Sequence, residues 1–345
     1  MNTHPIDRIA ALPAYVPGKP AKVKLASNEN PFPPLPSVIE AITVAAGEIN
    51  RYPDTASLEL REQVARKYDV PPEQVAIGAG SLTIGEQILQ AFTHEGDEIV
   101  YGWRSFEAYP LVSAVVGVRA IQVPLREHMY DLDAMLAAIT DRTRVIIVCN
   151  PNNPTGTAVQ RDRLVAFLDA VPSEVLVIID EAYGEYIDDP QIASGVDLIK
   201  GRQNACLLKT FSKAYGLAAL RIGYVVSENL DIAASVGKTA MPFSVSTIAQ
   251  AAAIASLHAE GELRDRVAQT TSERVRLTTE LRALGWTVPD SQANFVWIDS
   301  GTDTPELVRR LGAVGISGRA FGEEGIRVTV GTPDENDLFL SAVRG

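Results

Sequence analysis

The sequence has few cysteines, no long apolar run and no excess of positive charge. Its 345 residues include two cysteines, Cys149 and Cys206. Two cysteines cannot form a disulfide framework in a chain of this length, which excludes a disulfide-stabilised secreted scaffold. Both lie in apolar runs, so we predict buried side chains and not reactive thiols. The composition is typical of a reducing compartment, and we expect a cytoplasmic location.

The other absences narrow the class of protein further. No stretch approaches about 18 consecutive apolar residues, so no membrane-spanning helix is expected. The N-terminal segment lacks the charged-then-apolar pattern of a secretory signal. The formal net charge is −12, so the phosphate backbone of a nucleic acid is not an expected partner. The four histidines have no metal-ligand spacing, so no metal site is expected.

The order of predicted elements indicates two domains and an N-terminal arm. Residues 1–36 are rich in proline and are predicted to form an extended arm. In residues 37–230, predicted strands alternate with helices, and the runs at 145–148 and 175–179 are continuously apolar. Such runs are typical of a parallel sheet covered on both faces, so the large domain is predicted to be α/β, with a mostly parallel sheet flanked by helices. The mostly helical residues 231–345 end in short strands, which predicts a smaller α+β domain.

One lysine has unusual surroundings. Lys213 lies in the segment TFSKAYGLAALRIGY, between two apolar runs that predict buried strands. Burial penalises the charged amine, lowers its pKa and makes it a usable nucleophile. Thr210, Ser212 and Arg221 lie close by in sequence and could surround a compact anion with hydroxyls and a guanidinium fork. The alternative, a lysine in a surface loop, fits these apolar flanks poorly.

This segment resembles the cofactor-lysine motif of the fold-type I aminotransferases that use pyridoxal 5'-phosphate, within the histidinol-phosphate aminotransferase subfamily. Five further motifs occur in the family's order over nearly the whole chain: SNENP at 27–31, RYPD at 51–54, NPNNPTG at 150–156, DEAY at 180–183 and GIRVTVGT at 325–332. A sixth, GAGS at 78–81, precedes a predicted helix. The resemblance implies that Lys213 holds the cofactor as a Schiff base and carries the catalytic proton.

The resemblance also implies which residues contact the cofactor ring. Asp180, which ends a predicted buried strand, would keep the ring nitrogen protonated; its alternative role is a helix N-cap. Tyr183 and Asn153 are similar to the residues that bind the ring oxygen. Phe106 is similar to the aromatic residue that stacks on the ring, with Trp103 as the second choice.

The cofactor phosphate is expected at the GAGS turn. Ser81 and Leu82 would offer backbone N–H groups at the start of the following helix. The same turn is half of a dinucleotide fingerprint, but Thr83 stands where the third glycine belongs, so a nicotinamide dehydrogenase is a weak alternative. Tyr52 resembles a tyrosine that reaches the phosphate of the neighbouring subunit, which implies a homodimer with shared active sites.

Substrate recognition is also assigned by resemblance. Arg327 corresponds to the residue that grips the substrate α-carboxylate, and Arg319 corresponds to the family's second arginine. Asn30 and Asn294 are similar to residues near that carboxylate, and Tyr15 is similar to an arm residue that lines the side-chain pocket. The expected partners are a small amino acid and a 2-oxo acid.

Two subfamilies share all of these motifs. Several stretches, including GWRSFEAYP at 102–110 and SQANFVW at 291–297, are most similar to the actinobacterial aromatic amino acid aminotransferases. We therefore expect ping-pong transamination of phenylalanine and tyrosine, with tryptophan as a third candidate, against 2-oxoglutarate. Histidinol phosphate is the alternative substrate. A fold-type I decarboxylase is a further alternative, which an arginine that grips the carboxylate argues against.

Overall fold

The computed structural model describes residues 3–12 and 21–344 of the chain. Its largest element is a seven-stranded sheet with the strand order β2-β8-β7-β6-β5-β3-β4. All neighbouring strands pair in parallel except β8, which runs antiparallel to both β7 and β2. The strands are β2 (Val75–Gly78), β3 (Glu98–Trp103), β4 (Arg119–Pro124), β5 (Thr143–Cys149), β6 (Leu176–Asp180), β7 (Ala205–Thr210) and β8 (Gly223–Val226).

The central strands are apolar because helices cover the sheet. Every residue of β6 is buried, as the continuous β-branched run at 175–179 predicts, and every residue of β7 is buried too. Cys149 and Cys206 are buried and free, as expected, within the region 21–344. The covering helices are α4 (Ser81–Phe92), α5 (Ala108–Val116), α6 (Leu132–Ala137), α7 (Arg161–Ala170), α8 (Gly195–Ile199) and α9 (Leu230–Thr239).

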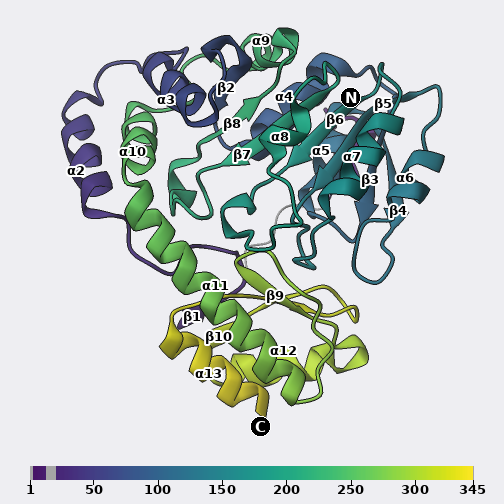
Figure 1. Cartoon of the computed structure of the whole chain (residues 1–345), viewed down its shortest axis with the longest axis vertical. Coiled ribbons are helices and arrows are strands. Elements are labelled where there is room, and N and C mark those ends of the chain that lie inside the picture. The colour runs from purple at the N-terminus through teal and green to yellow at the C-terminus, as the bar shows by residue number, and fades with distance from the viewer. Residues whose placement is uncertain (1–2, 13–20, 345) are drawn as a thin grey trace.

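The seven-stranded sheet and its helices form the upper body in Figure 1, which also contains α2, α3, α10 and the short helix α1. Helix α10 packs against both α2 and α3 at one side of the sheet. The bounds are α1 (Asp7–Ala10), α2 (Pro36–Ala45), α3 (Leu58–Tyr68) and α10 (Thr247–His258). In the described residues, no helix is both long and apolar enough to cross a membrane.

A smaller body with its own apolar core lies below the first (Figure 1). Helix α11 (Glu260–Ala283) runs from one body into the other. The antiparallel sheet has the order β11-β12-β9, and the N-terminal strand β1 pairs in parallel with β10. The predicted α/β fold class with a small α+β part is confirmed, whereas the boundaries after residues 36 and 230 stay predictions. The remaining elements are β1 (Val23–Lys24), β9 (Phe295–Ile298), β10 (Ile316–Ser317), β11 (Arg319–Ala320), β12 (Ile326–Thr329), α12 (Thr304–Ala313) and α13 (Pro333–Arg344).

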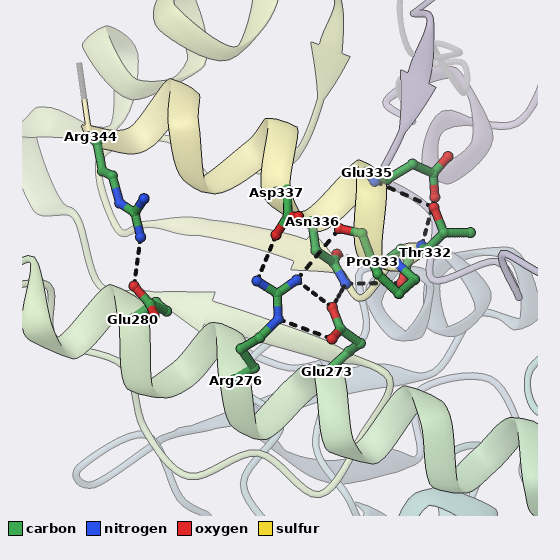
Figure 2. A network of polar contacts seen from close by, with 10 residues as sticks. Glu273, Arg276, Glu280, Thr332, Pro333, Glu335, Asn336, Asp337 and Arg344 are labelled. Carbon is green, nitrogen blue, oxygen red and sulfur yellow. Dashed lines mark hydrogen bonds and ion pairs between the residues drawn. The ribbon is translucent and has the colours of Figure 1, made fainter.

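A polar network joins α11 to the C-terminal helix α13 (Figure 2). Arg276 donates to Glu273 at 2.6 Å and to Asp337 at 2.7 Å. The buried Asn336 donates to the same Glu273 at 2.7 Å and accepts from the backbone N–H of Gly331 at 2.9 Å. Because Gly331 follows β12 closely, this network fixes the end of the strand that carries Arg327.

Candidate active site

The Lys213 amine lies in the loop that follows β7, at the boundary between the two bodies. The side chain is half-buried, and its Nζ donates to the carbonyl of Ser27 at 3.2 Å. It lies 5.8 Å from the centre of the Tyr183 ring. Burial, reinforced by the guanidinium of Arg327, lowers the pKa of Lys213 to about 7. An amine with this pKa is partly neutral at physiological pH, so it can act as a nucleophile or a base.

A buried carboxylate ends the neighbouring strand β6. One oxygen of Asp180 accepts a hydrogen bond from the Tyr109 hydroxyl at 2.6 Å. The other, Oδ1, is buried and has no hydrogen-bond partner among the residues that the structure describes. Burial raises the pKa of Asp180. Asp180 and Phe106 line a small cavity together with Ser81 and Leu82. A buried acceptor of this kind fits a protonated ring nitrogen, which would supply the missing donor.

Tyr109 has a place in the site that was not predicted from the sequence. Its ring lies edge-on to Phe106, with ring centres 5.5 Å apart. Phe106 lies two residues before α5 and Tyr109 lies in its first turn, and their separation of three positions is the signal that could have linked them. Trp103, the second choice for the stacking residue, lies instead under the guanidinium of Arg104 at 4.5 Å. The structure therefore brings Phe106, and not Trp103, to the cavity beside Asp180.

An anion cradle lies at the start of helix α4. The backbone of Gly80 has a φ of +94°, and a Cβ there would lie 2.7 Å from Nη2 of Arg221. A Cβ on Gly223 would lie 2.7 Å from the backbone nitrogen of Ser81. No side chain in the described part of the chain caps α4, and the first N–H groups of a helix have no acceptor within it. These close approaches bring free N–H donors and a guanidinium to one place, where an anion is stabilised.

Two hydroxyl residues border this cradle. Arg221 donates to Ser212 Oγ at 3.4 Å and to the carbonyl of Ala218 at 3.0 Å. Thr210 Oγ1 accepts from the backbone N–H of Ser212 at 3.1 Å. The structure thus brings together all of the residues predicted to hold the phosphate from within one chain, although their roles stay predictions.

Arg327 links the small body to the large one. Its Nη1 donates to Asn153 Oδ1 at 2.5 Å, and its Nη2 donates to the carbonyl of Ala26 at 2.5 Å. The side chain is 7% exposed, and its Nε is buried with no partner among the described residues. A buried cation of this kind, with a donor still free, is suited to bind a carboxylate.

Asn28 is a second residue that sequence reasoning missed. Its Nδ2 donates to the Tyr183 hydroxyl at 2.9 Å, and its backbone N–H donates to Thr329 Oγ1 at 2.9 Å. Asn294 Nδ2 donates to the Asn28 carbonyl at 3.2 Å. Asn30 donates to the carbonyl of Ala214, next to Lys213, at 2.8 Å, and its predicted place near the substrate carboxylate stays a prediction. The positive φ of Asn28, +54°, belongs to a conformation that asparagine tolerates better than most residues do.

Of the other predicted residues, Tyr52 and Arg319 are not part of this cluster within the chain. Tyr15 lies outside the described residues. Tyr52 is 80% exposed and stacks on Phe243, with ring centres 4.3 Å apart. Arg319 binds Glu107 through two hydrogen bonds of 3.0 Å each.

The combination of features defines a class of protein. A low-pKa amine, a buried acid with a free oxygen, an anion cradle at a helix start and a buried arginine together suit a group-transfer enzyme. Such a site has the donors and charges that suit a planar anionic cofactor and a carboxylate substrate. Residues 20–343 match the family model Aminotransferase class I and II. The chain belongs to this family and is an aminotransferase, which confirms the resemblance seen in its motifs.

Individual relatives are similar over almost their whole length. The chain is 52% identical to an aromatic amino acid aminotransferase of Thermobifida fusca, covering 97% of this chain and 94% of the relative. It is 52% identical to one of Streptomyces coelicolor, covering 96% and 94%. Among solved structures, it is similar to histidinol-phosphate aminotransferase from Sinorhizobium meliloti in complex with pyridoxal-5'-phosphate. That similarity has a TM-score of 0.91 at 29% identity and covers 100% of this chain and 97% of the other.

Proposed function

We propose that this enzyme transfers the amino group of aromatic amino acids, chiefly phenylalanine and tyrosine and also tryptophan, to 2-oxoglutarate. The observation that carries the substrate class is the 52% identity, over nearly the full length, to relatives named aromatic amino acid aminotransferase. The reaction class is supported by family membership and by the cluster around Lys213.

The proposed cofactor is pyridoxal 5'-phosphate, and the free Oδ1 of Asp180 supports this choice. Bound there, the cofactor would delocalise the electron pair that is left when a substrate Cα loses its proton. Asp180 would hold the ring nitrogen, Tyr183 and Asn153 the ring oxygen, and Phe106 one ring face. The phosphate would be held by Ser81, Leu82, Thr210, Ser212 and Arg221.

Lys213 is proposed to serve twice. It would hold the cofactor covalently, and as a free amine it would take the proton from the substrate Cα. A pKa of about 7 suits this role because the neutral amine is available near neutral pH. Arg327 grips the α-carboxylate and thereby orients the Cα–H bond toward Lys213. One site serves the amino acid and the 2-oxo acid in turn, so we expect ping-pong kinetics.

We further propose a homodimer in which Tyr52 of each protomer reaches the cofactor phosphate of its partner. The stacked pair of Tyr52 and Phe243 is exposed, and Met241, two residues before Phe243 in the chain, is 75% exposed. Val44 and Ile49, at the end of α2 and just beyond it, are 73% and 68% exposed. Several large exposed apolar side chains support an interaction surface. We also propose a cytoplasmic location, which two free buried cysteines support.

Histidinol phosphate is the second candidate substrate, favoured by the structural similarity to an enzyme named for it. A paired assay distinguishes the two: phenylalanine or histidinol phosphate, each supplied with 2-oxoglutarate. The proposal predicts phenylpyruvate and glutamate from phenylalanine, at a higher kcat/KM than histidinol phosphate gives. Preference for histidinol phosphate would reverse the assignment, and phenethylamine as the product would indicate a decarboxylase.

A further inference from the structure

Asn28 lies between Tyr183 and the end of strand β12. Its Nδ2 donates to the Tyr183 hydroxyl at 2.9 Å. Its backbone N–H donates to Oγ1 of Thr329, the last residue of β12, at 2.9 Å, and its Oδ1 accepts from the Thr329 hydroxyl at 3.3 Å. All three side chains are buried. The side chain of Asn28 thus connects the small body to a residue that is proposed to bind the cofactor.

The Thr329 hydroxyl fixes which way the Asn28 amide points. Thr329 Oγ1 accepts from the Asn28 backbone N–H, and its own proton needs an acceptor, which is Asn28 Oδ1. If the amide were turned over, its NH₂ group would face Thr329, and a buried hydroxyl proton would lose its acceptor. Asn28 is therefore held as a donor toward Tyr183.

The Tyr183 hydroxyl consequently has its own proton left to donate. Its oxygen accepts from Asn28, and within residues 3–12 and 21–344 no side-chain or backbone acceptor takes the Tyr183 proton. Burial raises the pKa of this hydroxyl, so it keeps the proton near neutral pH. Asn28 thus makes Tyr183 a donor toward an oxygen that it meets in the site.

The second residue proposed to bind the ring oxygen is directed in the same way. Oδ1 of Asn153 accepts from Arg327 Nη1 at 2.5 Å, which leaves the Asn153 Nδ2 as the group that can reach a ligand. Tyr183 and Asn153 therefore both present donors. Two donors stabilise a ligand oxygen in its anionic form, whereas a protonated oxygen would find no acceptor in either residue.

We propose that Asn28 is a positioning residue that directs the Tyr183 hydroxyl proton to the ring oxygen of the cofactor and so stabilises that oxygen as an anion. This inference deepens the proposed function and rests on its placement of Tyr183. A hydrogen bond donated to the anionic oxygen lowers its proton affinity, so Asn28 lowers the pH at which the bound cofactor loses the proton shared between its ring oxygen and its linkage to Lys213. The visible absorbance of the cofactor changes when that proton is lost, and the midpoint of this change is the quantity to measure.

Other ionisable groups lie around Tyr183 and also affect this midpoint. They are Arg327 of β12, Asp180 of β6, Cys149 of β5, and Lys213, whose Nζ is 5.8 Å from the centre of the Tyr183 ring. The test variants leave all four unchanged.

The direct test is Asn28→Asp. An aspartate keeps the shape of the side chain and tolerates the positive φ of this position, +54°, but when ionised it can only accept from Tyr183. The Tyr183 proton then turns to the new carboxylate and away from the cofactor. We expect the absorbance midpoint of the holoenzyme to rise by about one pH unit, as the loss of one hydrogen bond to an anion implies.

A double variant separates the direction of the hydrogen bond from the charge of the new carboxylate. Tyr183→Phe alone should raise the midpoint by a similar amount. Adding Asn28→Asp to it should change the midpoint by no more than about 0.3 pH unit, because no hydroxyl is left to direct. A carboxylate that acted only through its charge would shift both backgrounds equally, and this result would overturn the inference.

Asn229→Asp is the matched control. Asn229 caps α9 through its side chain, a role that aspartate fills equally well, and it follows the end of β8 that lies away from the cradle. The midpoint should be that of the wild type. A shift equal to that of Asn28→Asp would show a general effect of added charge and would count against Asn28.

Asn28→Gly is measured as well, because a buried charge can hinder folding. Glycine accepts the positive φ and adds no charge. It removes the donor that supports the Tyr183 oxygen, so the midpoint should rise in the same direction but by less than in Asn28→Asp. A thermal melt checks the folding of each variant. An unchanged midpoint in folded Asn28→Asp, or in Asn28→Gly, overturns the inference.

The titration needs no substrate, so its result is separate from the substrate assignment. If Tyr183→Phe leaves the midpoint unchanged, the proposed contact with the ring oxygen fails, and the role of Asn28 fails with it. If Tyr183→Phe raises the midpoint and Asn28→Asp does not, the proposed function stands and Asn28 has no such role. If the wild type does not transaminate phenylalanine but both substitutions raise the midpoint non-additively, the substrate proposal fails and the role of Asn28 stands.

Discussion

Arg327 donates from Nη1 to Asn153 Oδ1 at 2.5 Å, across the boundary between the two bodies. The residue proposed to bind the substrate carboxylate is therefore bonded to the residue proposed to bind the cofactor ring. A substrate that binds Arg327 is thus placed in a fixed relation to the ring and to Lys213, which is the condition for efficient proton transfer.

Arg327→Gln tests this arrangement. The shorter, uncharged amide loses the charged fork that binds a carboxylate and the Nη1 donor to Asn153, so kcat/KM for phenylalanine should fall by about 10²–10³-fold. Steady-state kinetics measure the loss, and the visible absorbance of the bound cofactor should be retained. Arg309→Gln, on the exposed face of α12, serves as the control and should keep full activity. An unchanged kcat/KM in Arg327→Gln would contradict the proposal that Arg327 binds the substrate α-carboxylate.

Asp180→Asn tests the proposal that the Asp180 carboxylate keeps the ring nitrogen of the cofactor protonated. The amide can still accept from the Tyr109 hydroxyl, but it carries no charge to keep a ring nitrogen protonated, so kcat should fall by about 10²–10³-fold. Tyr109→Phe removes only the hydrogen bond that the hydroxyl donates to one oxygen of Asp180. It should lower kcat by about tenfold or less, as the loss of one hydrogen bond implies. Activity in Asp180→Asn equal to that of Tyr109→Phe would contradict the assigned role.

The partial success of sequence reasoning has a physical basis. Asp180 ends β6 and Lys213 follows the adjacent parallel strand β7, and the apolar character of both segments predicts buried strands directly. Asn28 has no such signal, because its partners Tyr183 and Thr329 are 155 and 301 positions away. The pairing of Arg319 with Glu107 has no such signal either, because the two residues are 212 positions apart. Contacts of this range arise only when the two bodies pack, and local patterns do not encode them.

The lowered pKa of Lys213 has a consequence for stability. In the cofactor-free protein, burial lowers this pKa from 10.5 to about 7. Between these values the unfolded chain binds more protons than the native state, so this group makes stability rise with pH. The destabilisation is complete below about pH 7 and disappears as pH approaches the unfolded value. Lys213→Met should therefore raise Tm at pH 7, with a gain that shrinks toward pH 10. A gain that is constant with pH would contradict the lowered pKa.

A buried ion cluster on the same strands predicts a stability effect. Lys209 of β7 is 2% exposed and binds Glu181 at 3.1 Å and Glu185 at 2.8 Å. Lys209→Met leaves two carboxylates buried without their cation, which should cost about 3–5 kcal/mol in the free energy of unfolding. Urea denaturation measures the loss. Lys200→Met removes the exposed pair with Asp197 and should cost about 1 kcal/mol or less. Equal losses in the two variants would show that the buried cluster stabilises the fold no more than an exposed ion pair does.

The most direct test of the account is to locate the lysine that carries the cofactor. The holoenzyme is reduced with borohydride, which fixes a Schiff base as a stable secondary amine, and is then digested and sequenced by mass spectrometry. We predict the mass of a reduced pyridoxyl phosphate on the peptide containing Lys213, and no such mass in the Lys213→Ala variant, which should also lose nearly all turnover. A cofactor attached to another lysine, or an active Lys213→Ala enzyme, would contradict the account.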